Sequence, residues 1–108
     1  MKRGDVVTAV GRGDFSTKPR PCLIVQSDWF NEHHTSVTVC PITTVMTGKF
    51  FYRVPILCDA SNNLLADSEV EIDLVQAIRC ERIGRVIGEA SAEVMFTVDQ
   101  ALRRWLAL

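Results

Sequence analysis

The sequence of 108 residues lacks any segment that could cross a membrane or direct export. It contains no run of 18 apolar residues, which is about the minimum for a transmembrane helix. The chain begins Met1-Lys2-Arg3-Gly4-Asp5, without the apolar core that follows the basic end of a secretory signal. We therefore expect a cytoplasmic protein of one domain, residues 1–108, with no membrane partner.

The sequence also lacks a Cys-x-x-Cys pair, so no zinc-binding or thiol redox motif is present. Its four cysteines are far apart, each in or beside an apolar run: Cys22, Cys40, Cys58 and Cys80. Cysteine behaves as a small apolar residue in such surroundings, and we expect four free thiols in the core. A nucleophilic pair of one thiol with His33 or His34 has no local motif to support it. We expect neither metal nor cofactor.

Positive charge is absent from the middle of the chain. Residues 54–78 contain no Lys or Arg but five acidic residues, whereas the first 20 residues contain five basic and two acidic ones. The net charge of −1 excludes a general electrostatic attraction to nucleic acid. The uneven distribution places any phosphate ligand on the N-terminal side of the molecule.

Short apolar or alternating runs predict a mainly β protein. We expect strands at Asp5–Val10, Cys22–Val25, Thr35–Ile42, Phe50–Leu57 and Arg82–Gly88, with Ser68–Arg79 forming one long strand or two joined by a bend. Turn residues over Gly11–Asp14 begin a long connection that is a candidate functional loop. Ser27–His34 is a polar connector, and Pro41 is expected at a strand end or edge because it cannot donate to a ladder.

One helix is predicted at the C-terminus. Ser91 is a typical N-cap, and Glu93 lies in the first turn, where the helix dipole favours an acid. An apolar stripe follows at helical spacing: Val94, Val98, Ala101, Leu102 and Trp105. The helix should therefore lie across the sheet, which gives a small barrel or strongly curled sheet capped by a C-terminal helix.

Lys18-Pro19-Arg20-Pro21 is a stiff basic stretch at the entrance of the second predicted strand. Each proline fixes its own φ and restricts the residue before it, so Arg20 is held between two constrained positions. A guanidinium in such a position suits phosphate binding. The local sequence by itself favours an ordinary surface arginine in a loop.

The sequence resembles the MazF/PemK (Kid) family of toxins from type II toxin–antitoxin modules. Four motifs carry the resemblance: Lys2-Arg3-Gly4-Asp5-Val6-Val7, Arg20-Pro21-Cys22-Leu23-Ile24-Val25-Gln26-Ser27-Asp28, Pro41-Ile42-Thr43-Thr44 and Gln76-Ala77-Ile78-Arg79. The resemblance implies an SH3-like barrel of five to seven strands capped by the helix. It also implies a homodimeric, metal-independent endoribonuclease that cuts single-stranded mRNA and is neutralised by a partner antitoxin.

The same resemblance assigns site residues. It makes Arg20 and Thr43 catalytic, and 2′-OH attack would leave a 2′,3′-cyclic phosphate. The predicted substrate-binding residues are Lys18, Thr44, Gln76 and Arg79. Some family members carry an arginine and an aspartate just before the glutamine of the last motif, whereas Leu74 and Val75 precede Gln76 here.

The general base has three candidates in the sequence. Asp73 could supply a catalytic carboxylate, because residues two apart in a strand share a face, or it could be a solvated strand residue. His33 and His34 are the others, because histidine titrates near neutral pH.

Two alternatives to a nuclease remain at this point. A toxin of the CcdB type would poison DNA gyrase by protein binding through the exposed C-terminal segment Trp105-Leu106-Ala107-Leu108. The missing acid before Gln76 and the net negative charge favour that function. A member that has lost its activity and only binds an antitoxin is the other alternative.

Overall fold

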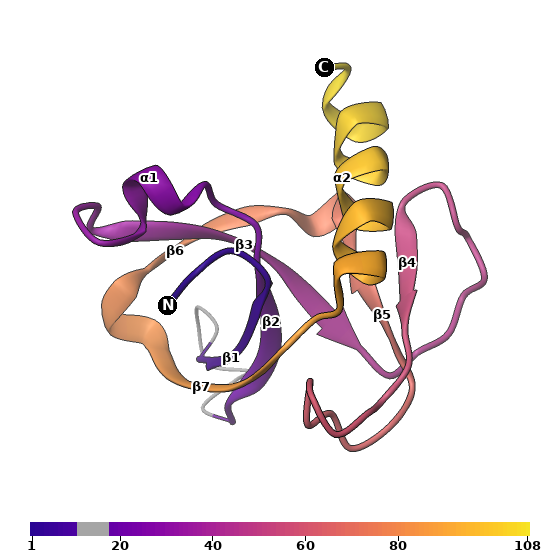
Figure 1. The fold of residues 1–108 in the computed structure, drawn as a ribbon, viewed down its shortest axis with the longest axis horizontal. Coiled ribbons are helices and arrows are strands. Elements are labelled where there is room, and N and C mark those ends of the chain that lie inside the picture. The colour runs from indigo at the N-terminus through magenta and orange to yellow at the C-terminus, as the bar shows by residue number, and fades with distance from the viewer. Residues whose placement is uncertain (11–17) are drawn as a thin grey trace.

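A computed structural model describes residues 1–10 and 18–108, which form a strongly curled antiparallel sheet and one long helix (Figure 1). The strands are β1 (Asp5–Ala9), β2 (Arg20–Ile24), β3 (Ser36–Thr43), β4 (Arg53–Ile56), β5 (Ser68–Glu71), β6 (Gln76–Arg79) and β7 (Ile83–Glu89). The helices are α1 (Asp28–Asn31), α2 (Ala92–Leu106) and the short 3₁₀ turns η1 (Ile72–Leu74) and η2 (Cys80–Arg82). The predicted mainly β class with a C-terminal helix is confirmed.

The central strand of the sheet is β3. The strand order is β4-β5-β3-β2-β1-β7, and β6 also pairs with β3. One edge of β3 pairs with β2, while the other edge pairs first with β6 and then with β5. Pro41 therefore lies inside β3, between Val39, the last partner of β6, and Ile42, the first partner of β5. The expectation of a strand end or edge for Pro41 was wrong, because β3 is a central strand that changes partner on one side at this residue.

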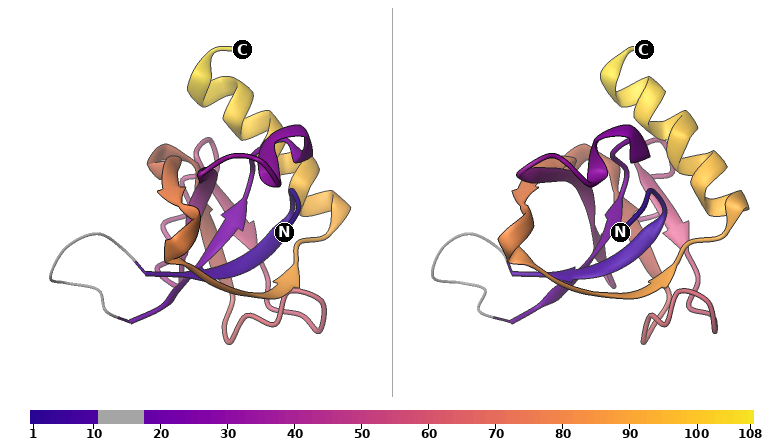
Figure 2. Two further views of the ribbon diagram at one scale, coloured as in Figure 1. Left: turned by 90° about the vertical axis from the view of Figure 1, so that its left-hand side faces the viewer. Right: turned by 60° about the vertical axis from the view of Figure 1, so that its left-hand side comes forward.

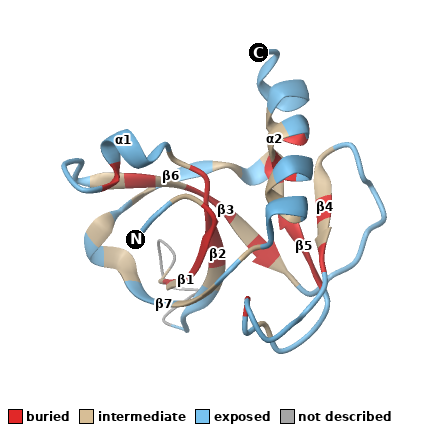
Figure 3. Cartoon of the chain, viewed as in Figure 1, coloured by how far each residue is buried: buried red, intermediate tan, exposed pale blue. Residues whose placement is uncertain are grey.

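Most residues of the β1-β2-β3 segment are buried (Figure 3), and they belong to two core clusters, one on each face. The face toward α2 carries one core cluster, which includes Val6, Leu23, Ile42, Val70 and Val98. The opposite face, called here the concave face, carries a second cluster: Val7, Ala9, Cys22, Ile24, Val37 and Val39, with Ile78 and Ile83 packed against it. The sheet curls around this second cluster, which explains why β2 is apolar at consecutive positions rather than alternating.

The α2 helix begins as predicted. The Ser91 Oγ atom accepts a hydrogen bond of 3.1 Å from the Val94 N–H group, which satisfies one of the free donors of the first turn. Val98 and Ala101 of the predicted stripe are buried. Trp105 packs against Tyr52, with ring centroids 5.8 Å apart. Figure 2 shows the helix standing along one side of the curled sheet.

Three further segments can be compared with the predicted elements. Ser68–Arg79 is two strands, β5 and β6, separated by η1, which is the second of the two arrangements expected. The predicted strand Phe50–Leu57 is shortened to β4. The connector Ser27–His34 contains α1, whose N-cap is Ser27, with an acid in the first turn. The predicted turn Gly11–Asp14 lies outside the described residues.

The cysteines are free, but only two lie in the core. Burial raises the pKa of Cys22 to about 11 and that of Cys40 to about 12, so both thiols stay protonated. Cys58 is exposed and Cys80 is partly exposed, which corrects the expectation that all four are buried. No helix within residues 1–10 and 18–108 is long and apolar enough to cross a membrane.

Candidate active site

The strand register brings Arg20 and Thr43 together on the concave face. Cys22 pairs with Pro41 and Ile24 with Val39, so continuing the register by two residues places Arg20 opposite Thr43. Directly opposed residues of antiparallel strands have Cβ atoms about 5 Å apart. Arg20 alternates with Cys22 and Ile24 of the concave core cluster, so it belongs to that face. Two residues 23 positions apart in the sequence thus become neighbours at one end of β2 and β3.

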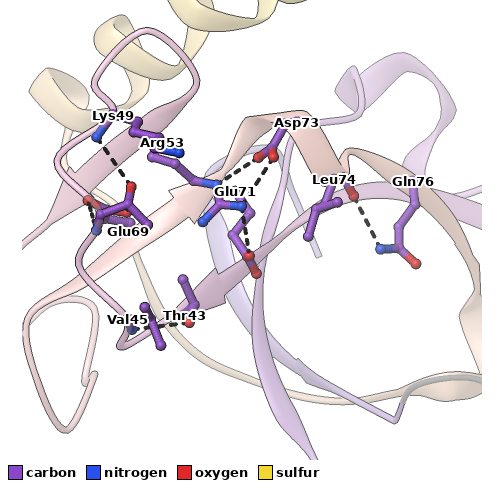
Figure 4. Close-up of polar contacts among 10 residues, drawn as sticks. Thr43, Val45, Lys49, Arg53, Glu69, Glu71, Asp73, Leu74 and Gln76 are labelled. Carbon is purple, nitrogen blue, oxygen red and sulfur yellow. Dashed lines mark hydrogen bonds and ion pairs between the residues drawn. The ribbon is translucent and has the colours of Figure 1, made fainter.

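Arg20 and Thr43 both keep hydrogen-bonding capacity. The Thr43 Oγ1 atom accepts a hydrogen bond of 3.1 Å from the Val45 N–H group, which fixes the side chain and leaves the hydroxyl hydrogen to donate elsewhere (Figure 4). Arg20 is exposed, and within the described part of the chain its guanidinium makes no hydrogen bond or ion pair. Arg20 and Thr43 can therefore donate to the same phosphoryl group.

Asp73 is already bound by an arginine. The Arg53 side chain on β4 donates to both Asp73 carboxylate oxygens, from Nε at 2.8 Å and from an Nη atom at 3.1 Å (Figure 4). These hydrogen bonds lower the pKa of Asp73 below the ordinary aspartate value, although its partial burial opposes the shift. A carboxylate with a lowered pKa and both oxygens engaged is a weak proton acceptor.

The loop after Thr43 is held by hydrogen bonds to a fully buried carboxylate. Glu69 on β5 pairs directly with Thr43 and is 0% exposed. It accepts hydrogen bonds from the Thr47 N–H group (3.0 Å), the Thr47 hydroxyl (2.9 Å) and the Gly48 N–H group (2.9 Å). Burial alone would raise the pKa of Glu69, but these hydrogen bonds and nearby Arg53 lower it, so the side chain stays ionised.

Glu71 is a carboxylate of the concave face that the sequence reasoning missed. It lies on β5 and alternates with Glu69, so both side chains share the face of Thr43. Burial, Asp73 and Glu69 raise the pKa of Glu71, and Arg53 opposes them. The alternation Glu69-Val70-Glu71 indicates that both acids lie on one face of a strand. The sequence does not say which face, and the pairing of β5 with β3 shows that it is the face of Thr43.

The predicted substrate-binding residues spread along the sheet. Gln76 pairs with Val39 and Arg79 with Ser36, toward the far end of β3 from Thr43. Both line a cavity of about 200 Å³ together with Ser36 and Arg82. Lys18 is exposed two residues before β2. Thr44 instead lines a separate, mainly apolar cleft of about 270 Å³, with Pro19, Pro21 and Leu65 among its other lining residues.

The histidines lie at the opposite end of β3 from Thr43. The His34 Nδ1 atom accepts a hydrogen bond of 3.2 Å from the Ser36 N–H group, and His33 is exposed on the neighbouring turn. Seven residue steps of about 3.3 Å separate Ser36 from Thr43, a span of about 23 Å. Neither histidine therefore lies near Thr43. Outside residues 11–17, no group of three or more His, Cys, Asp or Glu side chains is arranged to hold a metal ion.

Comparison with known proteins identifies the class that this fold and site define. Residues 2–106 match the model of the PemK-like and MazF-like toxins of type II toxin–antitoxin systems. The chain belongs to this family. The predicted resemblance is therefore confirmed, and the prediction of an endoribonuclease toxin is confirmed at the level of the family.

Individual relatives cover nearly the whole chain. The chain is 35% identical over 108 residues to a probable MazF endoribonuclease from Mycolicibacterium smegmatis, covering 100% of this chain and 98% of the relative. It is similar to the structure of the Mycobacterium tuberculosis toxin MazF-mt6, with a TM-score of 0.81, 33% identity and coverage of 96% and 97%. An endoribonuclease from mycobacterial species, solved with its cognate antitoxin, shares the fold, with a TM-score of 0.82, 23% identity and coverage of 100% and 96%.

Proposed function

We propose that this protein cleaves single-stranded mRNA at a phosphodiester held between Arg20 and Thr43. The observation that carries the proposal is the strand register, which places these two donors opposite one another at the end of β2 and β3. Both come from strands whose other residues pack in the core, so the sheet fixes their spacing. Preorganised donors of this kind stabilise charge that develops in a transition state.

The chemistry that suits this pair is attack by the RNA's own 2′-OH group. The 2′ oxygen bonds to phosphorus, the bond to the 5′ oxygen breaks, and the products are a 2′,3′-cyclic phosphate and a 5′-OH end. The pentacoordinate intermediate carries extra negative charge on its phosphoryl oxygens. Arg20 supplies a permanent positive charge to those oxygens and the Thr43 hydroxyl donates a hydrogen bond. The positive charge that a metal ion would otherwise supply comes from the protein, so we propose metal-independent cleavage.

An RNA cleavage assay in EDTA tests this function. We expect the purified protein to cut a defined single-stranded RNA, leaving a 2′,3′-cyclic phosphate. Arg20→Ala and Thr43→Val should each lower kcat/KM at least about 100-fold, the loss typical of removing a transition-state donor. Arg103→Ala, which removes an exposed arginine on α2, is the matched control and should cleave like the unaltered protein. Intact RNA with the unaltered protein, or full activity of Arg20→Ala, would overturn the proposal.

We also propose that the protein acts in the cytoplasm as a homodimer that a cognate antitoxin neutralises. The solved mycobacterial relative in complex with its antitoxin supports an antitoxin partner. RNA as substrate supports the cytoplasmic location. Co-expression with the product of an adjacent open reading frame, followed by co-purification, tests for the antitoxin. Sedimentation of the purified protein measures how many copies of this chain it contains.

A further inference from the structure

Cleavage by a 2′-OH group needs a proton acceptor near the scissile phosphate, and the candidates from the sequence do not supply one. Both oxygens of Asp73 accept hydrogen bonds from Arg53. His33 and His34 lie near the other end of β3, about 23 Å from Thr43 by strand length. Within the described residues, a different group on the concave face must therefore be considered.

Glu71 lies one step along the sheet from Thr43. Ile42 pairs with Val70 and Thr43 with Glu69, so the same register places Glu71 opposite Pro41 and diagonal to Thr43. Diagonal neighbours in an antiparallel pair have Cα atoms about 7 to 8 Å apart, within reach of a glutamate side chain. Figure 4 shows the Glu71 and Thr43 side chains on neighbouring strands. A phosphate bound by Arg20 and Thr43 can thus lie beside the Glu71 carboxylate.

The contacts of Glu71 leave it able to accept a proton. Arg53 is its cross-strand partner on β4, and the two side chains meet in an ion pair of 3.6 Å between one Nη atom and Oε2. The short hydrogen bonds of Arg53, 2.8 and 3.1 Å, both go to Asp73. The Glu71 side chain is 16% exposed, so it is partly shielded from water but still open to a ligand. Arg53 therefore holds Asp73 firmly and Glu71 loosely.

Burial and the neighbouring charges together raise the pKa of Glu71. Burial raises its pKa most, Asp73 on η1 and Glu69 on β5 raise it further, and Arg53 on β4 opposes them. The Cys22 thiol on β2 also faces this carboxylate, and the Glu71 charge contributes to the raised pKa of Cys22. A carboxylate whose pKa moves from the ordinary value of about 4.3 toward the working pH is a better general base.

We propose that Glu71 is the general base of this active site and that it takes the proton from the 2′-OH group of the RNA. The inference rests on the proposed endoribonuclease function. In the step, a Glu71 oxygen accepts the 2′-OH proton as the 2′ oxygen bonds to phosphorus. The departing 5′ oxygen takes a proton from solvent water, and Glu71 later returns its proton to solvent. Arg53 and Asp73 act as positioning residues that orient the Glu71 carboxylate.

A pH–rate profile distinguishes a general base from a residue that is merely structural. For the unaltered protein, kcat/KM should rise with pH along an acidic limb that ends above about pH 4.3. Glu71→Gln should lower kcat/KM by about 100-fold to 10,000-fold and remove that limb. Glu71→Asp should restore part of the activity. An RNA with a 2′-deoxy substitution at the mapped cleavage site cannot be cut and so measures binding alone. Its Kd should differ by less than about threefold between Glu71→Gln and the unaltered protein, since glutamine keeps the shape of the side chain.

Two controls complete the experiment. Glu32→Gln alters an exposed acid on the turn after α1, and it should leave the profile unchanged. Asp73→Asn tests the rival carboxylate. The inference is overturned if Glu71→Gln keeps the acidic limb, or if Asp73→Asn alone removes it. Those results would leave the proposed function intact as long as the unaltered protein cleaves RNA and Arg20→Ala does not.

Discussion

At the scale of single residues, the three acids of β5 and the following turn η1 have different roles because their hydrogen bonds differ. Glu69 is fully buried and holds the loop after Thr43 with three hydrogen bonds. Asp73 is engaged by Arg53 through both oxygens. Glu71 has one long ion pair and a raised pKa. Residue type alone could not have separated these roles, since all three are acids in the alternating segment that starts at Ser68.

Glu69→Gln should destabilise the fold by about 3 kcal/mol, because an amide presents one acceptor oxygen and an NH₂ group to donors that all need acceptors. Urea unfolding of the two proteins measures the difference. Glu81→Gln, at an exposed acid, should change stability by less than about 0.5 kcal/mol. An equally small effect of Glu69→Gln would show that the loop does not depend on this carboxylate.

At the scale of elements, the start and the buried face of α2 were predictable, whereas the pairing of β3 was not. The helix carries its own signals: a serine cap, an acid in the first turn and an apolar stripe. The partner change of β3 at Pro41 depends on where β5 and β6 lie, and these strands are encoded about 30 residues later. The short helix α1 had local signals in Ser27 and Asp28, but four residues are too few for a periodic pattern.

Ser91→Ala should cost about 1 kcal/mol of stability, the usual value of an N-cap hydrogen bond. Thr97→Ala is the control on the same helix. Its hydroxyl donates to the Glu93 carbonyl at an exposed position, so its removal should change stability by less than about 0.5 kcal/mol. Thermal unfolding of both variants provides the comparison, and equal losses would contradict the capping role of Ser91.

At the scale of the whole molecule, the sheet separates the site from the helix end. Arg20 and Thr43 belong to the concave face, whereas α2 packs on the opposite face. Trp105, which the gyrase alternative would use for protein binding, contacts Tyr52 and is 49% exposed. Leu106 and Leu108 are also exposed but are remote from the site on the chain's last turn. A nuclease of this architecture does not need them for chemistry.

Deletion of Leu106–Leu108 should therefore leave RNA cleavage within about threefold of the unaltered protein, since α2 packs on the face of the sheet opposite Arg20 and Thr43. Circular dichroism checks that the shortened protein folds. Toxicity on expression in a bacterial host should persist for the deletion and disappear for Arg20→Ala. A shortened protein that folds and cuts RNA but is no longer toxic would favour the protein-binding alternative.

The sequence by itself determined the mainly β class, the C-terminal helix and the pairing of a stiff Arg20 with Thr43 through family motifs. These depend on local preferences and on motif order, which a sequence contains directly. Only the tertiary structure decided which acids meet which donors. The register of β4 and β5 places Arg53 opposite Glu71, but the turn η1 after β5 brings Asp73 to the same guanidinium, which binds Asp73 at 2.8 Å and Glu71 at 3.6 Å. Register depends on interactions between distant segments, and a shift of one residue would turn each side chain of a strand to the other face.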